Sequence, residues 1–291
     1  MTTAVIGPTS LSSTIALEFL EHGMDSTSIV DAAYTMAAVW AQSGDEVREA
    51  QRLRYRVFAE EMGARLSVPA GTPPGHDADR FDDFCDHVLV RVASPLGPSK
   101  VVGTYRVLTP EAARRAGGFY SETEFDLARL AGMRTRMAEL GRSCIDPAWR
   151  KGGTILTLWS ALGEFMLKRR LDVAFGCASV GLGDGGHAAA SLWRQLERTH
   201  LAPPERRVRP LRPLELAALR GDDAVETPSL IRGYLRCGAE FLGPPAFDAD
   251  FNTADLPMLM TLAGLPQRHR RHFLGSDGAG RRASTSLATA S

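Results

Sequence analysis

The chain has 291 residues, of which 44% are hydrophobic, and its 34 Lys and Arg residues balance 34 Asp and Glu residues. This length and apolar content are sufficient for a globular core, in one large domain or two small ones. Because the net charge is zero, no global field draws the protein onto nucleic acid, and we expect no nucleic-acid partner.

The chain carries four cysteines and no obvious export or membrane signal. Cys85, Cys144, Cys177 and Cys237 form no CxxC pair, so we interpret them as reduced core residues. The N-terminus lacks the basic region of a signal peptide, and no segment reaches the about 18 apolar residues of a membrane span. We therefore predict a cytoplasmic protein and leave open a peripheral contact with the membrane.

Composition divides the chain into three parts. Residues 1–33 are rich in Ser and Thr with weak periodicity, and we expect a variable N-terminal extension there. Residues 275–291 have the composition of a disordered tail. One domain is expected between them, from 34 to 274.

The predicted elements of this domain mix helices with strands. Ser43 and Glu46 form a capping box for a helix over 45–64. Further helices are expected over 154–170 and 187–198. Strands are expected over 34–42, 87–94, 100–108, 136–145 and 172–180. This order predicts an α/β fold on a mixed sheet.

Two arginines occupy positions where apolar residues are expected. Arg54 lies near the middle of the apolar arc of the first helix, and Arg106 lies within the strand "VVGTYRVL". A guanidinium that faces a core needs an anionic partner. Three interpretations remain open: a structural ion pair, a side chain that extends its charged end to solvent, and an anionic ligand shared by the two arginines.

The segment "HDADRFDDFCDH" supplies carboxylates before the second strand, namely Asp77, Asp79, Asp82, Asp83 and Asp86. Its spacing does not match the EF-hand loop, so we expect no metal site. A solvated acidic loop, ion pairs with Arg54 and Arg106, and capture of a cationic substrate group remain as interpretations.

The strand "RMAELGRSCI" contains a carboxylate, a glycine and a guanidinium. Plain alternation would place Glu139 and Arg142 on opposite faces. A bulge at Leu140–Gly141 would turn both side chains into one cavity and leave a backbone N–H unpaired for an oxyanion. A surface ion pair between Glu139 and Arg142 is the alternative.

A basic glycine turn precedes the next helix. Arg150, Lys151, Gly152 and Gly153 stand before Thr154, where helix N–H groups could bind an anion. The Walker pattern is absent, which disfavours an NTPase, and an ordinary loop is the simpler interpretation.

Together these motifs resemble the carrier-binding core of the GNAT acyltransferase superfamily. The resemblance implies a GNAT-like, mostly antiparallel central sheet flanked by helices. The order and spacing of eight residues resemble the acyl-homoserine lactone synthase branch, although Ala64 stands near the place of that branch's aromatic residue. The eight are Arg54, Phe58, Asp77, Asp79, Asp82, Arg106, Glu139 and Arg142.

The longer motifs resemble the ornithine Nα-acyltransferases that make lyso-ornithine lipid in bacteria. They include "AQRLRYRVFAEEMGA", "DRFDDFCDHVLV", "GGFYSETEFD", "ELGRSCIDPAWR" and "SLIRGYLRCGAEFLGPPAFDADFNTAD", and the resemblance covers roughly 34–274. The segment "VGLGDGGHAAASLWRQLERTHLAPPERRVRP" departs from it. The resemblance implies transfer of a 3-hydroxyacyl chain from acyl carrier protein to the α-amine of L-ornithine.

This activity implies roles for the residues singled out above. Glu139 would be the base that frees the amine, and Arg142 or Arg106 would bind the amino-acid carboxylate. Asp79 and Asp82 would hold the side-chain ammonium or brace Arg54. Arg54, Phe58 and Asp77 complete the expected substrate-binding set. Arg150, Lys151, Gly152 and Gly153 would hold the phosphate of the donor's 4'-phosphopantetheine arm, and no permanently bound cofactor is expected.

Other functions remain as rivals. The nearest are an acyl-homoserine lactone synthase and an N-acyltransferase for another amino acid. A non-catalytic acyl-carrier-binding module belongs to a different class. A serine hydrolase built on Ser179 is distant, because Cys177 stands where a nucleophile elbow needs glycine.

Overall fold

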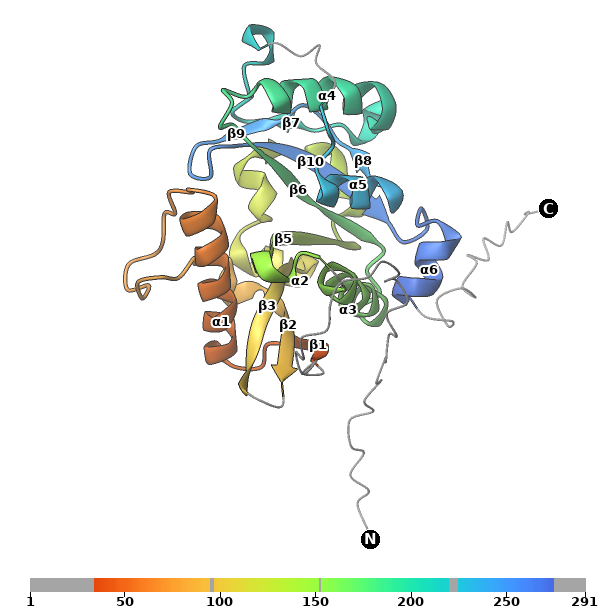
Figure 1. Cartoon of the computed structure of the whole chain (residues 1–291). Coiled ribbons are helices and arrows are strands. Elements are labelled where there is room, and N and C mark those ends of the chain that lie inside the picture. Colours follow the sequence, from red (N-terminus) through yellow and green to blue (C-terminus); the bar gives the residue numbers. More distant parts are fainter. Residues whose placement is uncertain (1–33, 95–96, 152, 220–224, 275–291) are drawn as a thin grey trace, which may run out of the picture. The chain divides into compact units, whose positions relative to one another are not determined.

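The structure is a computed structural model that describes residues 34–94, 97–151, 153–219 and 225–274 (Figure 1). The predicted extension (1–33), the predicted tail (275–291) and Gly152 lie outside the described residues. The main strands are β1 Thr35–Trp40, β2 Asp86–Ser94, β3 Gly97–Leu108, β5 Met137–Ile145, β6 Val173–Gly181, β8 Glu240–Phe241, β9 Ala246–Asp248 and β10 Thr253–Thr261. The α-helices are α1 Gly44–Tyr55, α2 Pro110–Ala116, α3 Thr154–Lys168, α4 His187–His200, α5 Ser229–Arg236 and α6 Gln267–Leu274.

The strands form one mixed sheet in the order β1-β2-β3-β5-β6-β10-β8, with β9 also paired to β10. Within it, β5 and β6 run parallel, and the other neighbouring strands pair antiparallel. The prediction of a mixed, mostly antiparallel sheet flanked by helices is therefore confirmed. The short strands β4 Phe125–Asp126 and β7 Arg209–Pro210 pair separately.

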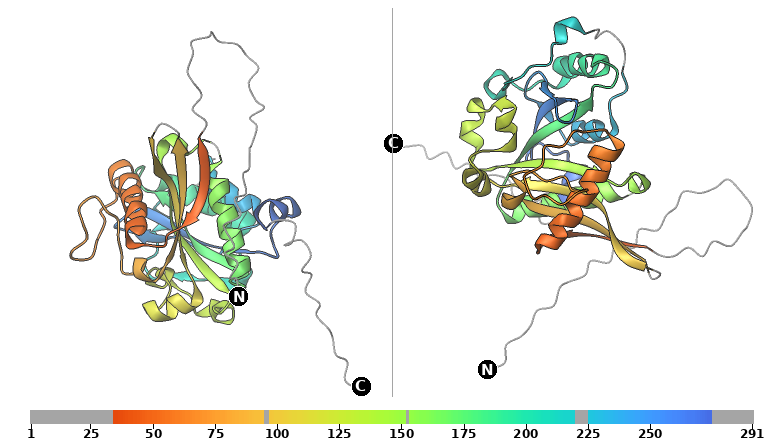
Figure 2. Two further views of the ribbon diagram at one scale, coloured as in Figure 1. Left: turned by 90° about the horizontal axis from the view of Figure 1, so that it is seen from below. Right: turned by 90° about the vertical axis from the view of Figure 1, so that its left-hand side faces the viewer.

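The side chains of β2 alternate between the two faces of the sheet, and both faces are buried. Val88 and Val90 pack with Leu158 of α3 on one face, whereas Leu89 packs with Leu53 of α1 on the other. This period of two is what a strand covered on both sides requires. Figure 2 shows α1 and α3 on either side of these strands.

The first helix begins as predicted and ends differently. The Ser43 hydroxyl accepts a hydrogen bond from the N–H of Glu46 at 3.3 Å, while the Glu46 carboxylate accepts one from the N–H of Gln42 at 2.7 Å. After Tyr55 the chain continues as a π-helix over Arg56–Glu61. Wider turns of this kind often occur at functional sites, and this one carries Phe58.

Strands β5 and β6 separate after a short stretch of pairing. Their register ends at Glu139 opposite Phe175, although both strands continue for several residues. At the point of separation, a Cβ on Gly176 would lie 2.3 Å from the carbonyl oxygen of Leu140, so only glycine permits this approach. Beyond it the two strands leave a gap in the sheet.

The predicted bulge exists, but it lies further along β5. Arg142 and Ser143 together stand opposite Tyr105 of β3, whereas Gly141 stays in register with Arg106. The residue with a left-handed backbone is Arg142, at φ 51°, and not Gly141. The expectation of a Leu140–Gly141 bulge was therefore wrong in position, because the extra residue is accommodated where β5 has already left β6.

Candidate functional site

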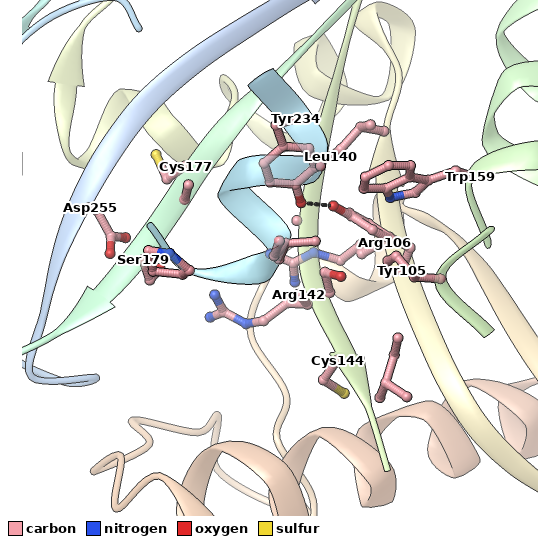
Figure 3. A pocket seen from close by; sticks show the side chains of 18 of the residues that line it. Tyr105, Arg106, Leu140, Arg142, Cys144, Trp159, Cys177, Ser179, Tyr234 and Asp255 are labelled. Carbon is pink, nitrogen blue, oxygen red and sulfur yellow. Dashed lines mark hydrogen bonds between the residues drawn. The ribbon is translucent and has the colours of Figure 1, made fainter. Parts of the chain in front are cut away.

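A cavity of about 790 Å³ occupies the gap between β5 and β6 (Figure 3). Glu139 and Arg142 both line it, so the prediction that the two side chains share a cavity is confirmed. Ser179 and Asp255 line the side formed by β6 and β10. Apolar side chains come from the π-helix and α3, among them Val57, Phe58, Met62, Ile155, Leu156 and Trp159.

Glu139 is held by backbone amides rather than by a cation. Its carboxylate accepts hydrogen bonds from the N–H of Tyr120 at 2.6 Å and from the N–H and hydroxyl of Ser121 at 2.7 and 2.5 Å. The residue is 4% exposed. Burial raises the pKa of Glu139, and the bonds from Ser121 and Tyr120 oppose that rise. The group is a fixed carboxylate whose affinity for a proton is increased.

Arg54 lies behind the cavity and not in it. Its side chain is 0% exposed and bonds Asp77 through Nε at 2.7 Å and Asp82 through a terminal nitrogen at 2.9 Å. A second bond reaches the Asp77 carbonyl oxygen at 2.7 Å. Arg54 is not among the residues that line the cavity, so its expected contact with the substrate stays a prediction.

Two further arginines complete this group, which we call the arginine cluster: Arg54, Arg106 and Arg142 with Asp77, Asp79 and Asp82. Arg106 bonds Asp79 and Asp82 at 2.7 Å each, and Arg142 bonds Asp79 at 3.1 Å. Although burial opposes it, Arg54 and Arg106 hold the pKa of Asp82 far below its usual range. Arg106 and Arg142 likewise lower the pKa of Asp79 against the effect of burial. The cluster contains three cations and three anions.

Of the two cluster arginines that line the cavity, Arg142 is more exposed than Arg106. Its side chain is 13% exposed, and its Nε is buried with no hydrogen-bond partner among the described residues. The guanidinium lies 5.0 Å from the ring centre of Tyr120 and 4.7 Å from that of Phe251. Two aromatic faces and a strained backbone thus fix its position.

Asp248 and Asp255 line the cavity and Glu124 lies beside Asp255, and we call these three carboxylates the acidic wall. Asp255 is 5% exposed and accepts a hydrogen bond from the Thr253 hydroxyl at 2.8 Å. Burial and then the charge of Asp255 raise the pKa of Glu124 to about 8. Burial also raises the pKa of Asp255. The acidic wall was missed from sequence, although "GGFYSETEFD" and "AFDADFNTAD" contain it.

Two carboxylates of the acidic wall belong, together with Cys177, to the one group of described residues that has metal-ligand spacing. Ligand atoms of Glu124, Cys177 and Asp255 lie within 4.8 Å of one another. The thiol of Cys177 donates to Glu124 at 3.5 Å. Burial and then Glu124 raise the pKa of Cys177 well above its ordinary value, which keeps the sulfur protonated. A metal binds the thiolate, so this set is poorly suited to one.

The basic glycine turn lies at the start of α3. Arg150 lines the cavity but also forms an ion pair with Glu61 at 2.6 Å. Gly153 caps α3 without a side-chain bond, and Ile155 and Leu156 of the first turn reach the cavity. Lys151 is exposed. The turn therefore borders the cavity at a helix N-terminus, where unpaired N–H groups favour an anion.

Ser179 does not have the geometry of a hydrolase nucleophile. It lies inside β6, paired in register with Asp255 of β10. A nucleophile elbow requires a sharp turn between a strand and a helix.

No helix among the described residues has both the length and the apolar character needed to cross a membrane.

Comparisons with known proteins agree with the topology. Residues 53–160 match the family described as "Acetyltransferase (GNAT) domain". A protein of Rhodobacter capsulatus named L-ornithine N(alpha)-acyltransferase is 37% identical over 249 residues, which cover 80% of this chain and 92% of that protein. A protein of Agrobacterium fabrum with the same name is 35% identical over 268 residues, covering 88% and 90%.

A solved structure supports the fold alone. FeeM, an N-acyl amino acid synthase from uncultured soil microbes, superposes with a TM-score of 0.50 at 11% identity. The match covers 82% of this chain and 98% of FeeM. At this level of identity the similarity concerns the arrangement of strands and helices.

Proposed function

Because the chain belongs to the L-ornithine N(alpha)-acyltransferase family, we propose that it transfers a 3-hydroxyacyl chain from acyl carrier protein to the α-amine of L-ornithine. The product is lyso-ornithine lipid, formed in the first step of ornithine lipid synthesis. The observation that carries the proposal is that a buried carboxylate, Glu139, and a guanidinium, Arg142, line one cavity where β5 and β6 separate.

Glu139 acts as the base. An α-amine has a pKa of about 8, so most of it is protonated at neutral pH and must lose a proton before it attacks. Because burial raises the pKa of Glu139, the carboxylate is a stronger proton acceptor than an exposed glutamate. The amine nitrogen then bonds to the thioester carbonyl carbon, the C–S bond breaks, and the thiolate leaves and takes up a proton.

Arg142 positions the amino acid and its backbone stabilises the oxyanion. The planar guanidinium suits the α-carboxylate, and its Nε forms no hydrogen bond among the described residues. Arg106 is committed to Asp79 and Asp82, which makes it the weaker candidate. The Leu140 carbonyl faces β6, so strand alternation directs the N–H of Arg142 to the same edge, beyond the last paired residue. That N–H is the oxyanion donor.

The donor enters from the start of α3. Its 4'-phosphopantetheine phosphate binds at the turn of Arg150, Lys151, Gly152 and Gly153, next to the unpaired N–H groups of the helix. The acyl chain lies along the apolar side of the cavity, which includes Phe58 and Trp159. Acyl carrier protein is the donor's carrier in this proposal.

The test is product analysis with purified protein. The protein is incubated with 3-hydroxyacyl carrier protein and, separately, ornithine, glycine or S-adenosylmethionine, and products are identified by mass. We expect acyl-ornithine above the other products. An acyl-homoserine lactone would identify a lactone synthase, and turnover of no amine would favour a binding module; either result would overturn the proposal.

A further inference from the structure

Every carboxylate of the arginine cluster is already paired with an arginine, so none is available to bind a substrate cation. Asp77, Asp79 and Asp82 are bonded by Arg54, Arg106 and Arg142 at 2.7 to 3.4 Å. Freeing one of them to bind an ammonium group would leave a buried guanidinium without its partner, which is costly. Asp79 and Asp82 therefore brace the arginines, and a cationic group must be recognised elsewhere.

The acidic wall has the opposite charge balance. Within the described ranges, none of Glu124, Asp248 and Asp255 forms an ion pair with Lys, Arg or His within 4.0 Å. Asp255 is more than nine-tenths buried, lines the cavity, and has a hydroxyl group as its partner. Buried carboxylates without a cation take up a proton, as the raised pKa values of Glu124 and Asp255 indicate, and a positively charged ligand would favour their ionised form instead.

A second observation points to a ligand in the same cavity. The Nε of Arg142 is buried and forms no hydrogen bond among the described residues, although it lies 3.4 Å from a carboxylate oxygen of Asp77 in an ion pair. Figure 3 shows the Arg142 side chain extending toward the side that carries Ser179 and Asp255. The space between them therefore has a guanidinium at one end and, at the other, carboxylates without a cationic partner among the described residues.

This arrangement complements a diamino acid, and the inference rests on the function proposed above. We propose that Glu124 and Asp255 bind the side-chain ammonium of ornithine and so select a diamino acid over neutral amino acids. The substrate carboxylate lies at Arg142, its α-amine faces Glu139, and its side chain extends along the acidic wall. A bound metal ion is the competing occupant, which the protonated thiol of Cys177 disfavours.

The experiment measures selectivity between ornithine and norvaline, which has the same carbon chain without the side-chain amine. Steady-state kinetics on the full chain compare wild type with Glu124→Gln, Asp255→Asn and the control Asp126→Asn, an exposed carboxylate that lines neither this cavity nor the pocket beside Glu124. We expect each wall variant to raise the KM for ornithine about 10²-fold with kcat changed less than about threefold. The control should behave as wild type.

Several results separate this inference from its rivals. Unchanged ornithine KM in both wall variants, with an active wild type, would overturn it and leave the proposed function intact. Loss of activity on removing divalent ions, restored by adding them back, would assign the wall to a metal instead. If wild type makes no acyl-ornithine, the proposed function itself fails. Thermal unfolding controls for folding, since loss of one of two repelling carboxylates should not lower Tm.

Discussion

Members of the arginine cluster and of the acidic wall line the same cavity, yet the charges of the two groups are balanced in opposite ways. In the cluster, guanidinium partners lower the pKa of Asp79 and Asp82 despite burial. In the wall, burial and neighbouring carboxylates raise the pKa of Glu124 and Asp255. The comparison indicates that the charges of the cluster neutralise one another and support the fold, whereas the wall lacks a cationic partner and suits a cationic ligand.

The largest expected effect comes from breaking the cluster. Arg54→Met would leave Asp77 and Asp82 buried without their main partner, so we expect a loss of about 3–5 kcal/mol in the free energy of unfolding. Denaturant titration measures it. Arg56→Met, at an exposed position two residues on, is the matched control. Equal stability of the two variants would mean that the cluster is not a support.

A substitution of Glu139 tests the proposed catalytic base. Glu139→Gln removes the proton acceptor while keeping the side-chain shape, so we expect kcat to fall about 10²-fold. Initial rates with saturating ornithine measure this. The control is Glu111→Gln, at an exposed position of α2. Near-normal turnover across the pH range would exclude Glu139 as the base and leave it a positioning role for Tyr120 and Ser121.

Arg142 links the cluster to the substrate, so its conservative replacement should affect binding first. Arg142→Lys keeps the charge but loses the planar fork, and we expect the KM for ornithine to rise about tenfold or more, with a smaller change in kcat. Kinetics at several ornithine concentrations measure this. A variant with wild-type KM and reduced stability would assign Arg142 to the support alone.

The smallest expected effect is the pH dependence of stability. Glu124 has a pKa of about 8 in the folded protein against 4.5 ordinarily, so the folded state retains a proton that the unfolded state releases. Its contribution to stability is therefore present below pH 4.5 and is lost as pH rises toward 8. The groups that face it are Tyr120, Cys177, Asp248 and Asp255.

Substitution isolates this contribution. In Glu124→Gln the decline in Tm between pH 5 and pH 8 should be smaller than in wild type, because the variant side chain has no proton to release. The carboxylates of the cluster act in the other direction, because lowered pKa values make their stabilisation fade as pH falls below about 4. An identical decline in variant and wild type would show that Glu124 is not buried as described.

Local sequence patterns were sufficient for much of the fold. The Ser43 cap, the alternation of Val88, Leu89 and Val90, and the apolar helix after Thr154 depend on neighbouring residues, and each appears where expected. Strand β10 was not predicted as a strand, because Pro257 interrupts its sequence and proline is disfavoured inside a sheet. Its pairing with β6 is a contact between distant segments.

The sequence by itself determined which chemical groups the site contains, since Glu139, Arg142 and the aspartates near 80 could be picked out by their unusual positions in apolar runs. Only the tertiary structure decided which charges neutralise one another. Arg54 and Asp82 meet across 28 residues, and Glu124 meets Asp255 only because β10 lies beside β6. Charge balance depends on distance in space, and local patterns carry no information about it.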